Sequence, residues 1–248
     1  MTAFDLSNPS LLLLIGLIIF FAYFIRSLTG FGSALICVPL LALWLDLKFV
    51  IPLVSLFEVG ISLLLIKSVY GQISRQTVLP MIIGAVIGVI LGSTILTALA
   101  DEALKKGLGL IIILFALNLL RGGSQQAKPA SPYWGGLAGG LGGLLGGLFG
   151  TSGPPYVMYL SYRLSDKTVL RASLIGLFTV EQIWRAGVFA AGGLVSLDML
   201  KVALLLTPAL IVGAILGDRV HLGLSDSRYR QLVAAILLIS GVILWQQP

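Results

Sequence analysis

Residues 78–99 read VLPMIIGAVIGVILGSTILTAL, an apolar run without a single charged side chain. A helix of about 20 such residues crosses the hydrocarbon core of a membrane. The rest of the 248-residue chain has a similar character, since 58% of its residues are hydrophobic and 10% are charged. Soluble domains average roughly 45–50% apolar and about 25% charged residues. The sequence therefore predicts a polytopic membrane protein built almost wholly of spanning segments.

Outward from this run, ten apolar segments follow one another along the chain. We expect them at about 10–28, 33–46, 49–67, 78–99, 107–121, 134–150, 154–164, 169–192, 199–217 and 231–246. The segments 33–46 and 154–164 are too short for comfortable full spans, so they are candidates for the arms of hairpins that enter the membrane and return. The expected fold class is an all-α polytopic membrane protein.

Related motifs in the two halves of the chain predict an internal duplication. Gly30 corresponds to Gly150, 120 positions further on, and the stretch Gly88–Gly92 corresponds to Gly213–Gly217, 125 positions further on. Between the halves, the stretch 122–133 has the only linker-like composition in the chain. We therefore expect an N-terminal membrane repeat over 1–121, a cytoplasmic linker over 122–133 and a C-terminal membrane repeat over 134–248.

The distribution of basic residues predicts that the two repeats are inverted. Each repeat holds about five segments, including one short or re-entrant hairpin, and an odd number turns the second repeat over in the membrane. Loops after odd-numbered segments hold eleven basic residues and the opposite side holds four, with Arg185 inside a segment. The eleven are Arg26, Lys67, Arg75, Arg121, Lys128, Arg163, Lys167, Arg171, Arg219, Arg228 and Arg230, and the four are Lys48, Lys105, Lys106 and Lys201. Because cytoplasmic loops are enriched in Lys and Arg, both termini are expected outside; a parallel repeat with broken helices is the alternative.

Glycines recur at helical spacing in two of the segments. Gly84, Gly88 and Gly92 are each four residues apart, and a second series comprises Gly136, Gly140, Gly143 and Gly147. Small residues at this spacing let helices approach closely in lipid. We interpret both series as helix-packing surfaces rather than as ligand sites.

Two glycine-rich turns at corresponding positions are the candidate substrate site. Glycine lets the backbone turn sharply, and a helix that begins with proline offers free N–H groups and a positive dipole end to an anion. Such a turn can hold a small anion without a fixed positive charge, and paired interruptions in two repeats are the usual indication of a transport site. Two tight turns that only pack are the alternative. The candidate residues are Thr29, Gly30, Phe31, Gly32 and Ser33 in the first turn, and Gly150, Thr151, Ser152, Gly153 and Pro154 in the second.

Four polar residues inside apolar segments are candidates for coupling or gating. They are Glu58, Glu181, Gln182 and Arg185. A charge in the membrane usually faces a cavity or a partner, and Glu181 and Arg185 have the i, i+4 spacing of an ion pair on one helix face. Glu58 has no basic neighbour on its own helix face and is the preferred proton-coupling residue. A pair that only locks the packing is the alternative for Glu181 and Arg185.

These turns resemble the signature regions of the TauE/SafE family of sulfite exporters. The first region is Thr29-Gly30-Phe31-Gly32 followed by Val38-Pro39-Leu40-Leu41, and the second runs from Gly146 to Pro155 as GGLFGTSGPP. The resemblance extends over nearly the whole chain. It implies an integral membrane permease for sulfite, sulfonates or related sulfur-containing anions. Thr151-Ser152 departs from the family pattern, which often has a second small aliphatic residue or glycine there, and this leaves the transported anion open.

The leading functional hypothesis is a secondary anion transporter of the plasma membrane that works by alternating access, with or without proton coupling. No nucleotide-binding loop is present, so ATP does not drive it directly. An intramembrane serine protease is the first alternative, because Gly150-Thr151-Ser152-Gly153 fits a Gly-x-Ser-Gly pattern, but the single histidine, His221, lies far along the chain. An anion channel of the same architecture is the second.

The expected partners are a small anionic substrate and the lipid bilayer. The basic residues are scattered singly between apolar runs, which excludes a nucleic-acid binder. One cysteine, Cys37, and one histidine leave no disulfide within the chain and no ligand set for a metal or haem cofactor. The sequence leaves the oligomeric state open, with a homodimer among the arrangements allowed.

Overall fold

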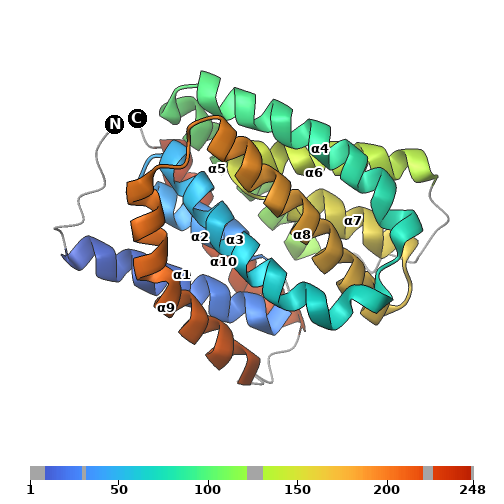
Figure 1. The fold of residues 1–248 in the computed structure, drawn as a ribbon. Coiled ribbons are helices and arrows are strands. Elements are labelled where there is room, and N and C mark those ends of the chain that lie inside the picture. The colour runs from blue at the N-terminus through green and yellow to red at the C-terminus, as the bar shows by residue number, and fades with distance from the viewer. Residues whose placement is uncertain (1–8, 30–31, 122–130, 220–225, 247–248) are drawn as a thin grey trace. The chain divides into compact units, whose positions relative to one another are not determined.

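The computed structural model describes residues 9–29, 32–121, 131–219 and 226–246. These residues form ten α-helices and one short 3-10 helix, η1 (Figure 1). The elements are α1 (Pro9–Thr29), α2 (Ser33–Ala42), α3 (Leu47–Val69), η1 (Tyr70–Gln72), α4 (Arg75–Ala98), α5 (Asp101–Arg121), α6 (Pro132–Phe149), α7 (Gly153–Arg163), α8 (Lys167–Ala191), α9 (Leu197–Arg219) and α10 (Asp226–Gln246).

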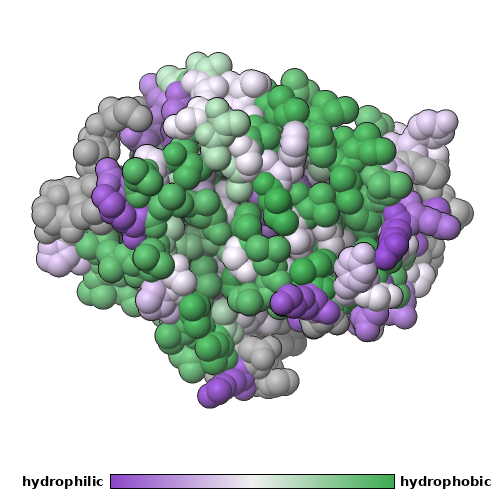
Figure 2. Space-filling model, in the orientation of Figure 1, coloured by the Kyte–Doolittle hydropathy of each residue, from purple (hydrophilic) through white to green (hydrophobic). Residues whose placement is uncertain are grey.

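The ten predicted apolar segments are confirmed as helices. Within the described ranges, five helices are long and apolar enough to cross a membrane, and their spans are Pro9–Ser27, Leu47–Lys67, Arg75–Ala98, Lys167–Ala191 and Leu197–Gly217. Hydrophobic side chains cover much of the face shown in Figure 2, as expected of a surface in contact with lipid. The second and seventh helices have 10 and 11 residues, so both are too short for a full span. The chain is an all-helical, multi-pass membrane protein.

The helices gather into two compact units that differ from the two halves of the sequence. Unit 1 comprises Met1–Val54, Leu99–Gly122 and Val195–Pro248, and unit 2 comprises Ser55–Ala98 and Gly123–Leu194. Each unit therefore contains helices from both halves of the chain, and α3 contributes its first part to unit 1 and the remainder to unit 2. The predicted division into two repeats describes a duplication within the sequence, which the boundaries of the compact units do not test. It stays a prediction.

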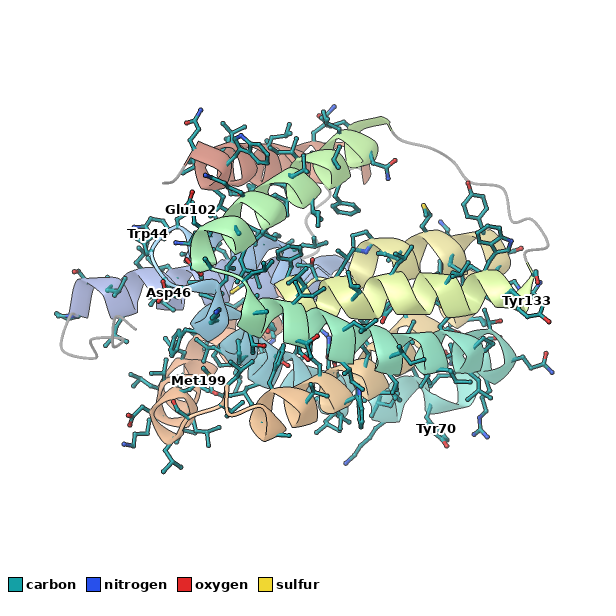
Figure 3. The ribbon with its side chains drawn as sticks, turned by 90° about the horizontal axis from the view of Figure 1, so that it is seen from above. Trp44, Asp46, Tyr70, Glu102, Tyr133 and Met199 are labelled. Carbon is teal, nitrogen blue, oxygen red and sulfur yellow. The ribbon has the colours of Figure 1, made fainter. Side chains whose placement is uncertain are left out.

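Unit 1 is organised around two helix pairs, α1 with α9 and α5 with α10. Glycines form both contacts: a Cβ atom added at Gly213 would collide with the carbonyl oxygen of Phe20, and one at Gly109 would lie 2.8 Å from the carbonyl oxygen of Gly241. The Asp101 carboxylate at the start of α5 accepts a hydrogen bond of 2.7 Å from the Leu47 N–H at the start of α3. Figure 3 shows Asp46 and Glu102 close to this junction.

Unit 2 is organised around α4 and α6, which lie side by side along most of their length (Figure 1). A Cβ atom added at Gly88 or Gly92 would collide with the backbone of α6, and one at Gly143 would collide with the backbone of α4 at Ala85. The two glycine series predicted to be packing surfaces therefore pack against each other. In lipid this close approach supplies the dispersion contacts that hold helices together.

Caps at the helix ends fix where α6 and α8 begin. The Ser131 hydroxyl accepts from the Tyr133 N–H at 3.4 Å, and the Asp166 carboxylate accepts from the Thr168 N–H at 2.7 Å and from the Val169 N–H at 3.3 Å. These two backbone hydrogen bonds, that of Thr168 first, hold the pKa of Asp166 below its usual value. Both helices therefore start at residues whose side chains take up otherwise unpaired N–H groups.

The contact between α1 and α9 yields a stability test. In a Gly213→Ala variant the new methyl group collides with backbone at Phe20, whereas in Gly16→Ala it would meet only the end of the Leu206 side chain at 3.9 Å. We expect Gly213→Ala to lose about 1–3 kcal/mol of stability by overpacking and Gly16→Ala to lose little. The thiol of Cys37, which is fully buried, reports unfolding when a thiol-reactive dye is present during heating. Equal melting temperatures for the two variants would contradict this packing.

Candidate functional site

The turn between α6 and α7 is closed by a left-handed glycine. Gly150 has φ 70°, a conformation that favours glycine, and follows the last residue of α6. Its N–H donates to the Gly146 carbonyl at 2.9 Å, and the Thr151 N–H donates to the Leu145 carbonyl at 3.4 Å. The first of these bonds is that of an αL cap, and the two bonds together satisfy carbonyls at the end of α6. The chain then reverses into α7 within a few residues.

The first turn of α7 leaves two backbone N–H groups without acceptors. Helix α7 begins at Gly153, and Pro154 and Pro155, which follow it, have no N–H to donate. Among the described residues, the N–H groups of Ser152 and Gly153 have no hydrogen-bond acceptor. Both residues are buried, Ser152 with 4% of its surface exposed. Such donors at a helix N-terminus are a ready site for a negatively charged group.

A buried ion pair lies beside these N–H groups. The Arg185 guanidinium contacts the Glu181 carboxylate at 3.0 Å, and both side chains are at most 1% exposed. Glu181 also accepts a hydrogen bond of 3.1 Å from the Ser152 hydroxyl. Arg185 donates further to the Gly146 carbonyl at 3.3 Å and to the Ser55 hydroxyl at 3.4 Å. The predicted pair on α8 is confirmed, and it is joined directly to the predicted turn.

Gly146 provides the space that the ion pair occupies. A Cβ atom at this position would lie 2.6 Å from a Glu181 carboxylate oxygen, 3.0 Å from Arg185 Nη1 and 3.2 Å from the Ser152 Cβ. Any side chain at residue 146 would therefore displace the buried charged groups of Glu181 and Arg185. The glycine is required here for close approach, not for an unusual backbone angle.

Tyr156 adds a further polar group to the site. Its side chain is fully buried, and among the described residues its hydroxyl has no hydrogen-bond partner. The ring packs against Phe178 and fills the space above Gly142, and it lies within electrostatic reach of Glu181 and Arg185. A buried hydroxyl without a partner is costly, so this group is available to a ligand.

A second group of hydrogen bonds connects α8 to α3. The Gln182 amide donates to the Glu58 carboxylate at 3.0 Å and accepts from the Ser62 hydroxyl. All three side chains are at most 5% exposed. Gln182 is therefore a hydrogen-bond partner that another helix supplies to Glu58. Since Gln182 is next to Glu181 in sequence, one turn of α8 carries both polar groups.

The described residues of the first predicted turn lie in unit 1. Gly30 and Phe31 fall outside the described residues, Thr29 ends α1, and Gly32 has φ 97° immediately before α2. Ser33, the first residue of α2, is 1% exposed, and its hydroxyl accepts a hydrogen bond of 3.0 Å from Arg26. The structure thus brings the second turn together with Glu181 and Arg185, and the first turn together with Arg26.

One interpretation of the sequence needs correction, and one is extended. Arg26 was counted among the loop residues, but it lies in the last turn of α1 with 6% of its surface exposed. The turn before α7 was predicted to be able to hold a small anion without a fixed positive charge; in addition, the Arg185 guanidinium reaches the carbonyl of Gly146, whose missing side chain lets it approach. An arginine inside an apolar segment can therefore contact a turn that lies far away in the sequence.

The sequence analysis also missed Ser55, Ser62, Gly146 and Tyr156. Ser55, Glu58 and Ser62 have the spacing i, i+3 and i+7, which places them on one helix face, and all are buried. That periodicity was a usable signal. Gly146 and Tyr156 carried none, because their roles depend on α8 packing against α6 and α7.

The serine-protease alternative gains no support from this geometry. The Ser152 hydroxyl donates to Glu181, whose carboxylate is already paired with a guanidinium. A serine nucleophile needs a free base within hydrogen-bond reach. His221, the base that the alternative required, falls outside the described residues.

Comparisons with known proteins place the chain among membrane transporters. The family model described as "Sulfite exporter TauE/SafE" matches residues 15–244. This range includes both turns and the buried polar residues on α3 and α8, which we call the polar cluster: Ser55, Glu58, Ser62, Glu181, Gln182 and Arg185. The chain is also similar to the probable inner membrane transporter protein TsaS of Comamonas testosteroni, with 29% identity over 196 residues, which cover 78% of this chain and 82% of the relative. No solved structure matches the chain significantly.

The buried ion pair can be tested by a double-mutant cycle. Replacing Arg185 with methionine leaves the buried Glu181 carboxylate without its cation, and we expect a loss of about 3–5 kcal/mol. Combining it with Glu181→Gln should restore part of that stability, because no unpaired charge remains. The control is the exposed pair of Lys201 and Asp198, at 2.8 Å, where Asp198→Asn should cost about 0.2–1 kcal/mol. Additive losses at Glu181 and Arg185 in thermal unfolding would show that they are not coupled.

Proposed function

Because the chain belongs to the TauE/SafE sulfite exporter family of membrane transporters, we propose that it carries sulfite, a sulfonate or a related small sulfur-containing anion by alternating access. The proposed binding site is the turn before α7, with the residues Gly150, Thr151, Ser152, Gly153 and Pro154. The corresponding turn before α2 is its counterpart in the first repeat.

One observation carries this proposal: two buried N–H groups without acceptors lie next to a buried guanidinium. The N–H groups are those of Ser152 and Gly153, and the guanidinium is that of Arg185, connected to them through Glu181. An anion that enters a membrane protein loses its hydration shell, which must be replaced by donors of the protein. A sulfur oxyanion has several acceptor oxygens and suits donors that converge from more than one direction. The unpaired hydroxyl of Tyr156 supplies a further donor.

The helix contacts within each unit support the proposed duplication. Gly88 contacts the carbonyl of Gly140 on α6, and Gly213 contacts the carbonyl of Phe20 on α1. The two contacts are related by the offsets between the two halves: Gly213 lies 125 positions after Gly88, and Phe20 lies 120 positions before Gly140. The same offsets convert the contact of Gly92 with Leu144 into that of Gly217 with Phe24. A helix pair built twice from equivalent residues fits two repeats that move against each other during transport.

We propose that both repeats lie in the plasma membrane in inverted orientation, with both termini outside and the linker 122–133 in the cytoplasm. The count of basic residues supports this topology, and the candidate spans support a multi-pass membrane protein. The TsaS relative is described as an inner membrane transporter protein, which agrees with a bacterial plasma membrane.

We further propose that transport is coupled to protons through the buried carboxyl groups. An anion that approaches the turn meets Glu181 as well as Arg185, and an ionised Glu181 would repel it. Protonation of this carboxyl would release the guanidinium to the anion. Glu58 on α3 accepts a hydrogen bond of 3.0 Å from Gln182, the residue that follows Glu181 on α8, and it is the proposed entry point of the proton.

Anion flux into proteoliposomes tests the binding site. Gly146→Ala pushes a methyl group into the ion pair and should reduce flux at least about tenfold, equivalent to about 1.4 kcal/mol. Gly140→Ala on the same helix meets only the Gly84 carbonyl at 3.8 Å and should transport normally. The anions to compare are sulfite, sulfate, thiosulfate, sulfoacetate and taurine. Saturable flux with counterflow indicates a carrier, and equal flux in the two variants would remove this turn from the mechanism.

Proton coupling is tested separately with Glu58→Gln. We expect this variant to exchange labelled anion across the membrane but to lose accumulation driven by a pH gradient, because the amide cannot release a proton. The control is Glu102→Gln, which changes an exposed carboxyl in α5 that pairs with Lys106. If Glu58→Gln still accumulates anion in response to the pH gradient, Glu58 is not the coupling group.

A further inference from the structure

A hollow in unit 2 lies away from the polar cluster, where the end of α3, η1, the start of α4 and the middle of α8 meet. Its volume is about 320 Å³, within the range of small-molecule sites, roughly 300–1,000 Å³. Its walls are almost entirely apolar. They are formed chiefly by the side chains of Ile66, Ile73, Val78, Leu79, Ile82 and Val180.

Hydrogen bonds fix the shape of this hollow. The Ser74 N–H donates to the Ser173 hydroxyl on α8 at 3.0 Å, and the Ser74 and Thr77 hydroxyls are 2.9 Å apart. The Ile73 side chain rests on Gly176, where a Cβ atom would lie 2.7 Å from it. The chain that links α3 to α4 is thereby held against α8, so the hollow is a built feature of unit 2.

The rim of the hollow carries a positive charge. Arg75 donates to the Tyr70 hydroxyl at 3.3 Å, and its guanidinium lies 5.4 Å from the centre of the Tyr70 ring. Both residues line the hollow and are exposed, and Tyr70 projects outward in Figure 3. No acidic residue lines the hollow. The hydrogen bond to Tyr70 uses one of the five N–H donors of the guanidinium, so several remain for an anionic group.

Basic residues predominate around this end of unit 2. The stretches 67–75 and 163–171 contain five basic residues and one acidic residue, Asp166. The bond between Ser74 and Ser173 brings the start of α4 against the first turns of α8, so these charges lie at the same end. A negatively charged headgroup is therefore favoured over a zwitterionic one.

We propose that this hollow is a binding site for an anionic phospholipid, with part of an acyl chain between α3, α4 and α8 and the phosphate on Arg75. The apolar wall matches hydrocarbon, and Leu79 and Val180, 60% and 42% exposed, continue the apolar surface outside the hollow. The rim cation matches the phosphate. A small sulfur oxyanion has no part that uses such walls, so the site is distinct from the transport turn.

The bound lipid would act on the helix that carries the polar cluster. Thr179 and Val180 line the hollow, and the next residue on α8 is Glu181. A lipid chain packed against these residues restricts the movement of this part of α8. Transport is therefore expected to depend on anionic lipid even though the lipid touches neither Glu181 nor Arg185.

Thermal unfolding of the purified full-length protein in detergent tests the site. The probes are phosphatidylglycerol, phosphatidylcholine with the same acyl chains, and free glycerol phosphate. We expect phosphatidylglycerol to raise the melting temperature, phosphatidylcholine to raise it much less, and glycerol phosphate to leave it unchanged. Arg75→Gln should weaken binding of phosphatidylglycerol about fivefold, as expected for loss of one basic residue at an anionic headgroup, whereas Arg171→Gln, which changes an exposed residue of α8 outside the lining, should weaken it less.

A cavity-filling variant tests the acyl chain independently of the headgroup. Val180→Trp fills the hollow from a partly exposed position and should abolish stabilisation by phosphatidylglycerol; Ile82→Phe replaces it if the tryptophan variant does not fold. Equal stabilisation by phosphatidylcholine, stabilisation by glycerol phosphate alone, or equal losses in Arg75→Gln and Arg171→Gln would each overturn the proposal. So would unchanged binding in a folded cavity-filling variant.

Discussion

The structure depends on the need to pair every backbone polar group that leaves a helix inside a membrane. At the turn between α6 and α7 this need is met for the carbonyls by the left-handed cap at Gly150, and it is avoided for two N–H groups by Pro154 and Pro155. The N–H groups of Ser152 and Gly153 are left without acceptors among the described residues. In lipid such donors cost free energy until a ligand accepts from them. The same arrangement that closes the turn therefore creates a place for an anion.

In the proposed site, the pairing of Arg185 with Glu181 would determine how firmly an anion is held. A buried guanidinium alone would attract an anion strongly and release it slowly, which suits storage rather than transport. With the Glu181 carboxylate at 3.0 Å, the anion must compete for the guanidinium. A buried pair of this kind contributes little net stability compared with apolar residues, so its presence points to a role in ligand exchange. The absence of a side chain at Gly146 allows the pair to reach the turn.

Much of the fold could be predicted from the sequence, because each helix corresponds to a local run of apolar residues. The pair of Glu181 and Arg185 follows from their i, i+4 spacing alone. The packing glycines could be recognised, but not which helix they contact. The roles of Gly146 and Tyr156 could not be predicted, since both depend on the positions of α7 and α8 relative to α6. Arg26 was misplaced for a related reason: a count of charges treats every arginine near a segment end as a loop residue, while this one turns inward to Ser33.

The two turns obtain a guanidinium by different routes. With the offset of 120 positions that relates Gly30 to Gly150, Arg26 on α1 corresponds to Gly146 on α6. In unit 1 the arginine at this position donates to the first residue of α2. In unit 2 the glycine at this position leaves room for Arg185, which arrives from α8 and donates to the Gly146 carbonyl. If the proposed duplication is correct, a turn that served only packing would have no need of a second arginine where the first is missing. What the two turns share is therefore a buried cation near the start of a short helix, and this is the combination that an anion site needs.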